Sequence, residues 1–180
     1  MDTLFFEKLL FEEESTTLDF KRGQYPFVNA TDADKSEVLK DILGFANTWR
    51  RSEAFILIGV EDVREAKANV VGIDDKDQLH DHSLQQFVNA RTNIPIRFSY
   101  EAFVFEGKQF GIIRIELQPR PIFLKSDFGR LKKNEVYVRR GSSTDPTKPA
   151  DPAEIAQMGL SIVSLASIKV EFADIDREVP

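Results

Sequence analysis

The sequence contains no cysteine, and this excludes disulfides, zinc sites built on thiolates and thiol catalysis. It also lacks a run of about 18 apolar residues, the length that a membrane-spanning helix requires. The start of the chain, MDTLFFEKLLFEEES, is acidic and has no basic segment of the kind that opens a secretory signal peptide. We therefore expect a cytoplasmic protein with no membrane partner.

Motifs for nucleotide chemistry are missing as well. Neither the phosphate-binding pattern GxxxxGK(S/T) nor the dinucleotide pattern GxGxxG occurs, so we expect no nucleotide cofactor. The chain has 2 histidines, His80 and His82, which flank Asp81 in a polar stretch. A serine nucleophile therefore has no separate histidine partner, and we assign both histidines to the surface.

The net charge of −6 argues against a protein that binds nucleic acid over its whole surface. A local basic patch stays open, because many of the basic residues are clustered. The clustered residues that we consider as phosphate ligands are Arg50, Arg51, Lys132, Lys133, Arg139 and Arg140. Taken one at a time, each cluster is also typical of a solvated surface.

Hydrophobic periodicity predicts an α+β fold with a mixed β-sheet flanked by helices. The continuous apolar run at 54–60 is typical of a buried central strand, and residues 69–73 are expected to pair with it. Residues 97–117 indicate a hairpin that turns at EGK, and residues 122–141 a second strand pair. A strand at 168–172 (IKVEF) is expected to pair within the domain or with another chain. Helices are expected over 2–11, from Asp32 or Asp34 at the N-cap to about 48, over 83–92, and from about 152.

The stretch EESTTLDFKRG, residues 13–23, includes a strand at about 16–21 in which successive side chains alternate between the two faces of the sheet. Asp19 and Lys21 then share one face, while the apolar residues between and before them point into a core. Many metal-dependent nucleases place a carboxylate two residues before a lysine in this way. The carboxylate binds Mg²⁺ or Mn²⁺, and the lysine orients water or stabilises charge on the phosphate. The alternative is an ion pair on the surface, which contributes little to stability.

One carboxylate rarely suffices to hold a divalent cation, so other acids are expected nearby. Glu14 precedes the strand and is able to turn back toward it, while Glu61 and Asp62 directly follow the buried strand. Because functional sites are often built at strand ends, we expect one acidic cluster of Glu14, Asp19 and either Glu61 or Asp62.

Five segments occur in an order and at a spacing that resemble a known family: ESTTLDFK (14–21), LGFANT (43–48), ILIGVED (56–62), VVGID (70–74) and VYVRRGSST (136–144). From about residue 12 to about 157, the chain resembles the Schlafen AlbA_2 domain. The resemblance implies an α+β fold that binds nucleic acid. In the ribonuclease members, it implies a metal-dependent acidic triad that cleaves structured RNA such as tRNA.

The resemblance also assigns site residues. The two N-terminal glutamates of the family fall on Glu14 and Asp19, and its third acid falls on Asp62, with Glu61 as the alternative. The family lysine falls on Lys21. These acids are the implied metal ligands for Mg²⁺ or Mn²⁺, and Glu14, Asp19, Lys21 and Asp62 are the implied catalytic residues. Asp19 departs from the family pattern, because its side chain is one methylene shorter than the usual glutamate.

Two further matches concern binding. The strand-end arginine of the family falls on Arg139. Where the family often has two glycines after ANT, this chain has WRRSEA, which places Trp49, Arg50 and Arg51 at a turn. That turn either adds a stacking and phosphate-binding element or is simply a packed surface turn.

Two hypotheses on function follow. The first is a metal-dependent endoribonuclease that acts on structured RNA, in defence or stress response. The second is a non-catalytic DNA- or RNA-binding module of a transcription regulator or defence protein. In both, the partner is nucleic acid, with RNA preferred because of the resemblance, and a homodimer is expected by analogy with the paired lobes of animal Schlafen proteins. The expected division of the chain is an N-terminal helix at 1–11, the nucleic-acid-binding or nuclease domain at 12–157, and a helix and tail at 158–180.

Overall fold

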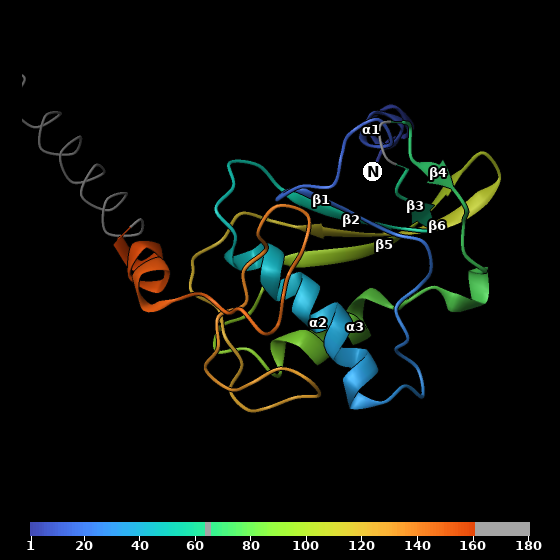
Figure 1. Ribbon diagram of the computed structural model, residues 1–180. Coiled ribbons are helices and arrows are strands. Elements are labelled where there is room, and N and C mark those ends of the chain that lie inside the picture. The colour runs from blue at the N-terminus through green and yellow to red at the C-terminus, as the bar shows by residue number, and fades with distance from the viewer. Residues whose placement is uncertain (64–65, 161–180) are drawn as a thin grey trace, which may run out of the picture.

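The computed structural model describes residues 1–63 and 66–160 (Figure 1). The expected strand at 168–172 lies outside the described residues, as does most of the expected C-terminal helix and tail at 158–180. Residues 152–160 form a helix, as the sequence predicts. Within the described ranges, no helix is both long and apolar enough to cross a membrane.

A four-stranded mixed sheet forms the centre of the domain and confirms the predicted α+β class. Its strands lie in the order β1-β2-β6-β5. Strand β1 pairs with β2 in parallel, and the other neighbouring pairs are antiparallel. The predicted hairpin is present, with its turn at Glu106 and Gly107. The strand bounds are Leu18–Lys21 for β1, Ala54–Ile58 for β2, Phe98–Phe105 for β5 and Lys108–Ile115 for β6.

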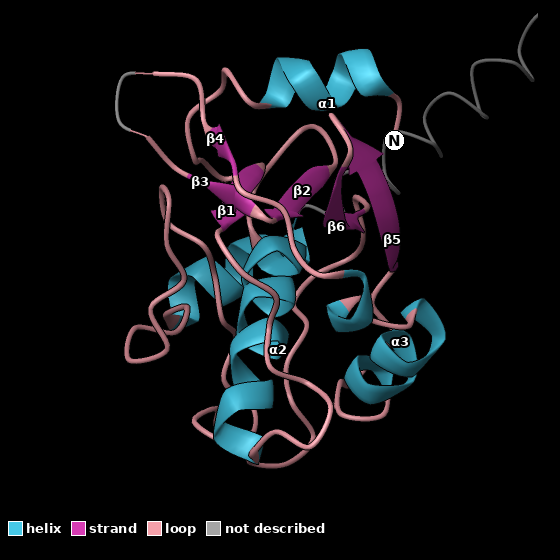
Figure 2. Cartoon of the chain, turned by 90° about the vertical axis from the view of Figure 1, so that its right-hand side faces the viewer, coloured by secondary structure: helices cyan, strands magenta, loops and turns pink. Residues whose placement is uncertain are grey.

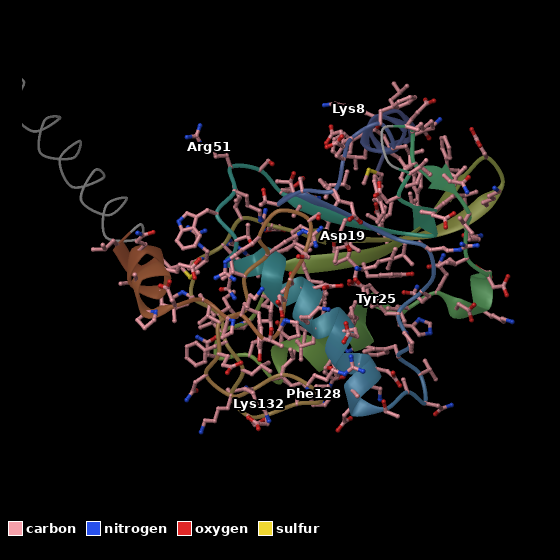
Figure 3. All side chains as sticks on the ribbon, in the orientation of Figure 1. Lys8, Asp19, Tyr25, Arg51, Phe128 and Lys132 are labelled. Atoms are coloured by element: carbon pink, nitrogen blue, oxygen red, sulfur yellow. The ribbon has the colours of Figure 1, made fainter. Side chains whose placement is uncertain are left out.

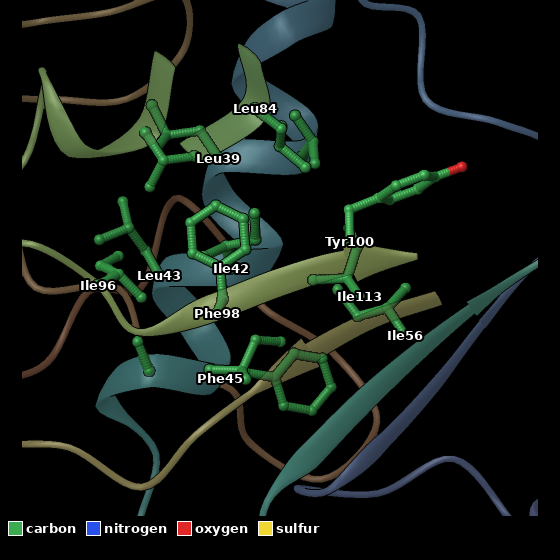
Figure 4. Close-up of a cluster of buried hydrophobic side chains, with 14 of the residues drawn as sticks. Leu39, Ile42, Leu43, Phe45, Ile56, Leu84, Ile96, Phe98, Tyr100 and Ile113 are labelled. Carbon is green, nitrogen blue, oxygen red and sulfur yellow. The ribbon is translucent and has the colours of Figure 1, made fainter. Parts of the chain in front are cut away.

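Helices cover both faces of this sheet (Figure 2). Helix α1 (Thr3–Leu9) lies on one face, while α2 (Asp32–Asn47) and α3 (Asp81–Asn89) lie on the other. Strand β2 is buried along its whole length, because its alternate side chains enter two different hydrophobic clusters. Figure 4 shows the cluster on the α2 side, where leucine and isoleucine side chains of α2 pack on Ile56, Phe98 and Ile113 of the sheet.

The apolar run at 54–60 is divided by Gly59, which has a φ of +94°. A Cβ at this position would lie 3.0 Å from the Phe110 ring and 3.1 Å from the backbone of Gly72, so a side chain is excluded for two reasons. The chain leaves the main sheet here. Strand β3 (Val60–Glu61) then pairs with β4 (Asn69–Val70) in a separate two-stranded sheet, so the pairing expected for 69–73 forms only with Val60 at the end of the run and not with β2. A short 3₁₀ turn, η1, follows at Asp75–Asp77.

The expected N-cap of α2 is wrong by one residue or more. Thr31 caps the helix, since its hydroxyl accepts the N–H of Asp34, and the Asp34 carboxylate accepts the N–H of Thr31 in return. This reciprocal pair is a capping box. Asp34 is therefore the partner of the cap at position N3.

The strand pair expected over residues 122–141 does not form. The segment has isolated bridges only, such as Phe128 with Leu131, and much of its backbone bonding is to side chains. The buried Asn47 at the end of α2 donates to the carbonyls of Ile122 and Tyr137 at 2.8 and 3.0 Å and accepts the N–H of Ile122 at 2.7 Å. One side chain thus supplies bonds that a neighbouring strand would otherwise make.

Candidate functional site

The site begins at a tight turn before β1, the edge strand that runs beside β2. The N–H of Ser15 donates to the carbonyl of Leu18 at 2.9 Å and closes the turn. Glu14, at the start of the turn, folds back so that its Oε1 accepts the N–H of Phe20 at 2.9 Å. The turn therefore brings the Glu14 carboxylate alongside the strand, as the sequence analysis expects.

Asp19 points to the α2 side of the sheet, and its exposed fraction is 2%. Its Oδ1 accepts a hydrogen bond from Arg139 at 2.8 Å. Its Oδ2 lies 2.8 Å from Nζ of Lys21, as an ion pair without a hydrogen bond. The pairing of Asp19 with Lys21 is therefore not the exposed ion pair that the sequence leaves open as an alternative. Figure 3 shows Asp19 inside the molecule, between the sheet and α2.

Arg139 is buried as well, and the structure gives it a role different from phosphate binding. Its guanidinium donates to the carbonyl of Ser15 at 2.6 Å and to that of Leu18 at 3.3 Å. It also lies over the ring of Phe45, 4.5 Å from the ring centroid. With an exposed fraction of 2%, this side chain has no surface to offer a nucleic acid in this arrangement.

Lys21 connects Asp19 to a second buried carboxylate, Asp41 of α2. Nζ of Lys21 lies 3.3 Å from Asp41, whose Oδ2 also accepts the hydroxyl of Tyr25 at 2.7 Å. Burial lowers the pKa of Lys21, but the charges of Asp41 and Asp19 outweigh burial, so that its pKa is raised overall. Burial and the Asp41 charge both raise the pKa of Tyr25.

Glu14 and Asp62 line the same pocket, of about 640 Å³, together with Ser142. Burial raises the pKa of Glu14, and the negative charges of Asp19 and Asp62 add to the effect, against the Phe20 N–H and Arg139, which lower it. Glu61 is directed elsewhere, because its carboxylate accepts Arg22 at 2.7 Å and Asn69 at 3.3 Å. Of the two candidates for the third acid, the structure places Asp62 beside Glu14.

The implied metal ligands do not assemble around one point. In the described part of the chain, no group of three or more His, Cys, Asp or Glu side chains is arranged to hold a metal ion. Asp19 is turned toward Arg139 and Lys21, which leaves Glu14 and Asp62 on the pocket. The predicted set of Glu14, Asp19 and Asp62 therefore does not fit a divalent cation in this arrangement, because both oxygens of Asp19 already lie beside positive groups.

The turn between α2 and β2 presents an aromatic ring and cations. Trp49 is 38% exposed, and the guanidinium of Arg120 lies 4.5 Å from its ring centroid. Arg51 is exposed and has no hydrogen bond or ion pair with any described residue. Arg50 instead stabilises the turn, because its guanidinium donates hydrogen bonds to the carbonyls of Phe45, Ser52 and Glu116. Burial lowers the pKa of Arg50 to about 10.

The other predicted phosphate ligands are exposed, and two of them, Lys132 and Arg140, have ion-pair partners. Lys132 pairs with Asp127 at 3.1 Å, and Arg140 pairs with Glu154 at 2.6 Å. Lys133 is exposed beside Lys132. Figure 3 shows Arg51 at the upper left and Lys132 at the lower left of the molecule, so these two cations are separated.

Sequence reasoning missed several residues of the site. Asp41 lies one helical turn after the buried Val38 and directly before Ile42, so a charge on the inward face of α2 was the signal that could have found it. Thr48 had no comparable signal. Its hydroxyl donates to the carbonyl of Gly44 at 2.6 Å and accepts the N–H of Arg139 at 2.9 Å, which only the fold brings close.

Together, these features define an α+β domain in which an edge strand, a capped helix and an irregular C-terminal segment meet at a buried ion cluster beside an acidic pocket. The chain belongs to the Schlafen AlbA_2 family, whose model matches residues 14–148. This confirms the resemblance seen in the sequence.

Solved structures give further likenesses. The DIP2311 protein from Corynebacterium diphtheriae matches with a TM-score of 0.51 and 17% identity, over 83% of this chain and 26% of that chain. This chain thus spans about a quarter of the length of that protein, and the likeness shows the fold. The N-terminal domain of a putative ATP-dependent DNA helicase RecG-related protein from Nitrosomonas europaea matches with a TM-score of 0.47 and 20% identity, over 81% of this chain and 94% of that domain. A search of the curated proteins gives no match.

Proposed function

We propose that this chain is a nucleic-acid-binding domain and that its contact surface includes the turn between α2 and β2. The observation that carries the proposal is the exposed stack of Trp49 and Arg120 beside the unpaired cation of Arg51. Exposed aromatic rings stack on bases, and arginines bind phosphate, so the two together suit single-stranded nucleic acid. Membership of the Schlafen AlbA_2 family supports the same function.

The rigidity of the turn supports the proposal further. Arg50 ties it to the end of α2 through Phe45 and to the end of β6 through Glu116. Arg120 adds a contact with the carbonyl of Asn47 at 3.5 Å. A platform that is held in place before binding loses little conformational entropy when a base stacks on it.

The test uses the single tryptophan of the chain as a reporter. We expect the fluorescence of Trp49 to be quenched when single-stranded RNA or tRNA is added to the full-length protein, and to be quenched less by duplex DNA. The RNA preference rests on the family resemblance. Arg51→Ala should weaken binding about tenfold, as expected for the loss of one charged contact.

Arg130→Ala is the matched control, because Arg130 is also an exposed arginine but lies in the loop that carries Lys132. Its affinity should stay within twofold of the wild type. If Arg130→Ala weakens binding while Arg51→Ala does not, the loop at 130–133 is the binding surface and the turn is not. If no nucleic acid binds at any salt concentration, the function itself is wrong.

Metal-dependent cleavage of RNA is a second candidate, which the acidic pocket favours. Glu14 and Asp62 face one cavity, and the raised pKa of Glu14 is typical of a functional carboxyl. The family resemblance adds Asp19 and Lys21 to this set with Mg²⁺ or Mn²⁺, but in the present arrangement Asp19 is held by Arg139 and Lys21. The chemistry that such an ion supplies is activation of an attacking oxygen and neutralisation of charge on the phosphate.

Incubation of the full-length protein with tRNA, total RNA and DNA tests this candidate. Cleavage in Mn²⁺ that stops in EDTA and falls at least a hundredfold in Asp62→Asn is expected if it holds. Intact nucleic acid in every reaction would remove the enzyme candidate and leave the binding function in place. The expected homodimer is tested separately by light scattering of the protein alone.

A further inference from the structure

We infer that the side chains of Arg139 and Lys21 take the place of a divalent cation at Asp19, so that Asp19 positions the turn of Glu14 and is not a metal ligand. The inference goes beyond the proposed function, because it concerns the protein alone, with or without nucleic acid. It rests on the contacts, burial and charge balance of this cluster.

Each oxygen of Asp19 already faces a cation. Arg139 donates to Oδ1 at 2.8 Å, and Nζ of Lys21 lies 2.8 Å from Oδ2. A magnesium or manganese ion bound to either oxygen at about 2.1 Å would lie next to one of these positive groups, and it retains several waters that need space. With an exposed fraction of 2%, Asp19 has no room for those waters.

The Oδ2 atom of Asp19 is buried and accepts no hydrogen bond, so it is a position where a cation would be stabilised. The ammonium of Lys21 neutralises the charge on this atom. Asp41 lies on the other side of Lys21, 3.3 Å from its Nζ. Two carboxylates, Asp19 and Asp41, thus face three cations, Lys21, Arg139 and Lys40, whose Nζ lies 3.6 Å from Asp41. A divalent ion added here would leave an excess of positive charge in a buried place, which is strongly unfavourable.

Arg139 connects Asp19 to the turn that places Glu14 at the pocket. Its remaining N–H groups hold the carbonyls of Ser15 and Leu18, the two residues that close the turn after Glu14. Asp19 keeps this guanidinium in place by charge, although it does not itself touch Glu14 through a hydrogen bond. Asp19 is therefore a positioning residue that acts through Arg139.

The experiment follows thermal unfolding and Mn²⁺ binding of the full-length protein, with calorimetry for the metal. Asp19→Asn should lower Tm by about 10 °C, because it leaves the buried charge of Arg139 without its partner. The affinity for Mn²⁺ should stay within twofold of the wild type. The double variant Asp19→Leu with Arg139→Met removes the pair together, so it should recover most of the lost Tm. It also keeps the comparison possible if Asp19→Asn fails to fold.

Asp75→Asn is the control for the metal measurement, since Asp75 is an exposed carboxylate that does not line the pocket of Glu14 and Asp62. Saturating Mn²⁺ should shift the Tm of the wild type, Asp75→Asn and the double variant by the same amount to within about 1 °C. The inference is overturned if Mn²⁺ raises the wild-type Tm by several degrees and this shift disappears when Asp19 is replaced. It is also overturned if the double variant is less stable than Asp19→Asn. No nucleic acid enters these measurements, so their outcome is independent of the proposed function.

Discussion

At the scale of single residues, the two carboxylates Glu14 and Asp19 flank one turn but have opposite surroundings. Asp19 is enclosed by cations, while Glu14 faces a pocket that it shares with Asp62. Burial and two neighbouring negative charges make the ionised form of Glu14 less favourable than it is in water. The pocket is acidic, because it is lined by four carboxylates and one lysine, Lys67.

This difference predicts a pH dependence of stability. The folded protein holds the proton of Glu14 more tightly than the unfolded chain, where the ordinary pKa is 4.5. The contribution of Glu14 to stability therefore falls as pH rises from about 4.5 through its raised pKa, and it is constant above that pKa. We expect the free energy of unfolding of Glu14→Gln to rise relative to that of the wild type as pH increases from about 4.5 through the raised pKa. The difference should be less than about 1 kcal/mol, because solvent screens a partly exposed group. Urea unfolding between pH 4 and 8 measures it.

Glu13→Gln is the control for this titration, since Glu13 is the exposed neighbour of Glu14 in the same pocket. Its stability should follow that of the wild type at every pH. A Glu14→Gln protein that loses stability relative to the wild type as pH rises would contradict the prediction.

At the scale of elements, the C-terminal end of α2 organises the irregular segment from residue 122 to 144. Asn47 binds the backbone of Ile122 and Tyr137, and Thr48 binds that of Arg139. Gly44 lets Thr144 lie directly on the helix, since a Cβ at Gly44 would be 2.2 Å from the hydroxyl of Thr144. The LGFANT motif (43–48) thus stabilises the packing of α2 against the segment 122–144, because its polar residues form hydrogen bonds with the backbone of that segment.

Gly44→Ala tests this close approach. Alanine raises helix propensity by up to about 1 kcal/mol, but overpacking against Thr144 is expected to outweigh the gain and to lower stability by about 1–3 kcal/mol. Gly159→Ala is the matched control, because Gly159 is also helical and its Cβ would have nothing within 4 Å. Chemical denaturation should show Gly159→Ala equal to or more stable than the wild type, and equal losses at both positions would argue against the contact.

Asn47→Ala tests the hydrogen bonds at the same end of α2. It leaves buried groups of Ile122 and Tyr137 unpaired, and each such group costs about 1–3 kcal/mol, so the free energy of unfolding should fall by about 3 kcal/mol. Asn69→Ala, at an exposed asparagine, should change it by no more than about 0.5 kcal/mol. Comparable midpoints for the two variants would mean that Asn47 does not hold the segment.

At the scale of the whole molecule, the positive charges that are free to meet a nucleic acid are spread out. The protein carries a net charge of −6, Arg139 is buried, and Arg51 and Lys132 lie apart, at the upper left and lower left of the molecule in Figure 3. A single-stranded nucleic acid that contacts the turn therefore meets two cations, Arg51 and Arg120. Binding by few phosphates makes affinity only moderately dependent on salt.

The salt dependence distinguishes this surface from the larger patch that the sequence predicts. Contact through Arg51 and Arg120 should give a slope of log K against log salt of about −1.4, whereas the six clustered basic residues together would give about −4. Fluorescence titrations of Trp49 with single-stranded RNA between 50 and 300 mM salt measure this slope. A slope near −4 would show that the other clustered basic residues, such as Lys132, also contact the nucleic acid.

The sequence by itself determined the elements and much of their pairing. The continuous apolar run at 54–58, the hairpin turn at Gly107 and the periodicity of α2 are set by neighbours along the chain, so they can be read locally. The proximity of Glu14 to Asp19 is equally local, because a single tight turn separates them.

Only the tertiary structure determined which groups surround Glu14 and Asp19. Arg139 lies 120 residues from Asp19 in the sequence and pairs with it because α2 fastens the irregular segment against β1. Asp62 lines the pocket and Glu61 does not, because the Glu61 carboxylate is held by Arg22 and Asn69. The charge of a buried carboxylate is balanced by whichever cation the fold brings beside it, and sequence spacing carries no information on burial or on partners so distant along the chain.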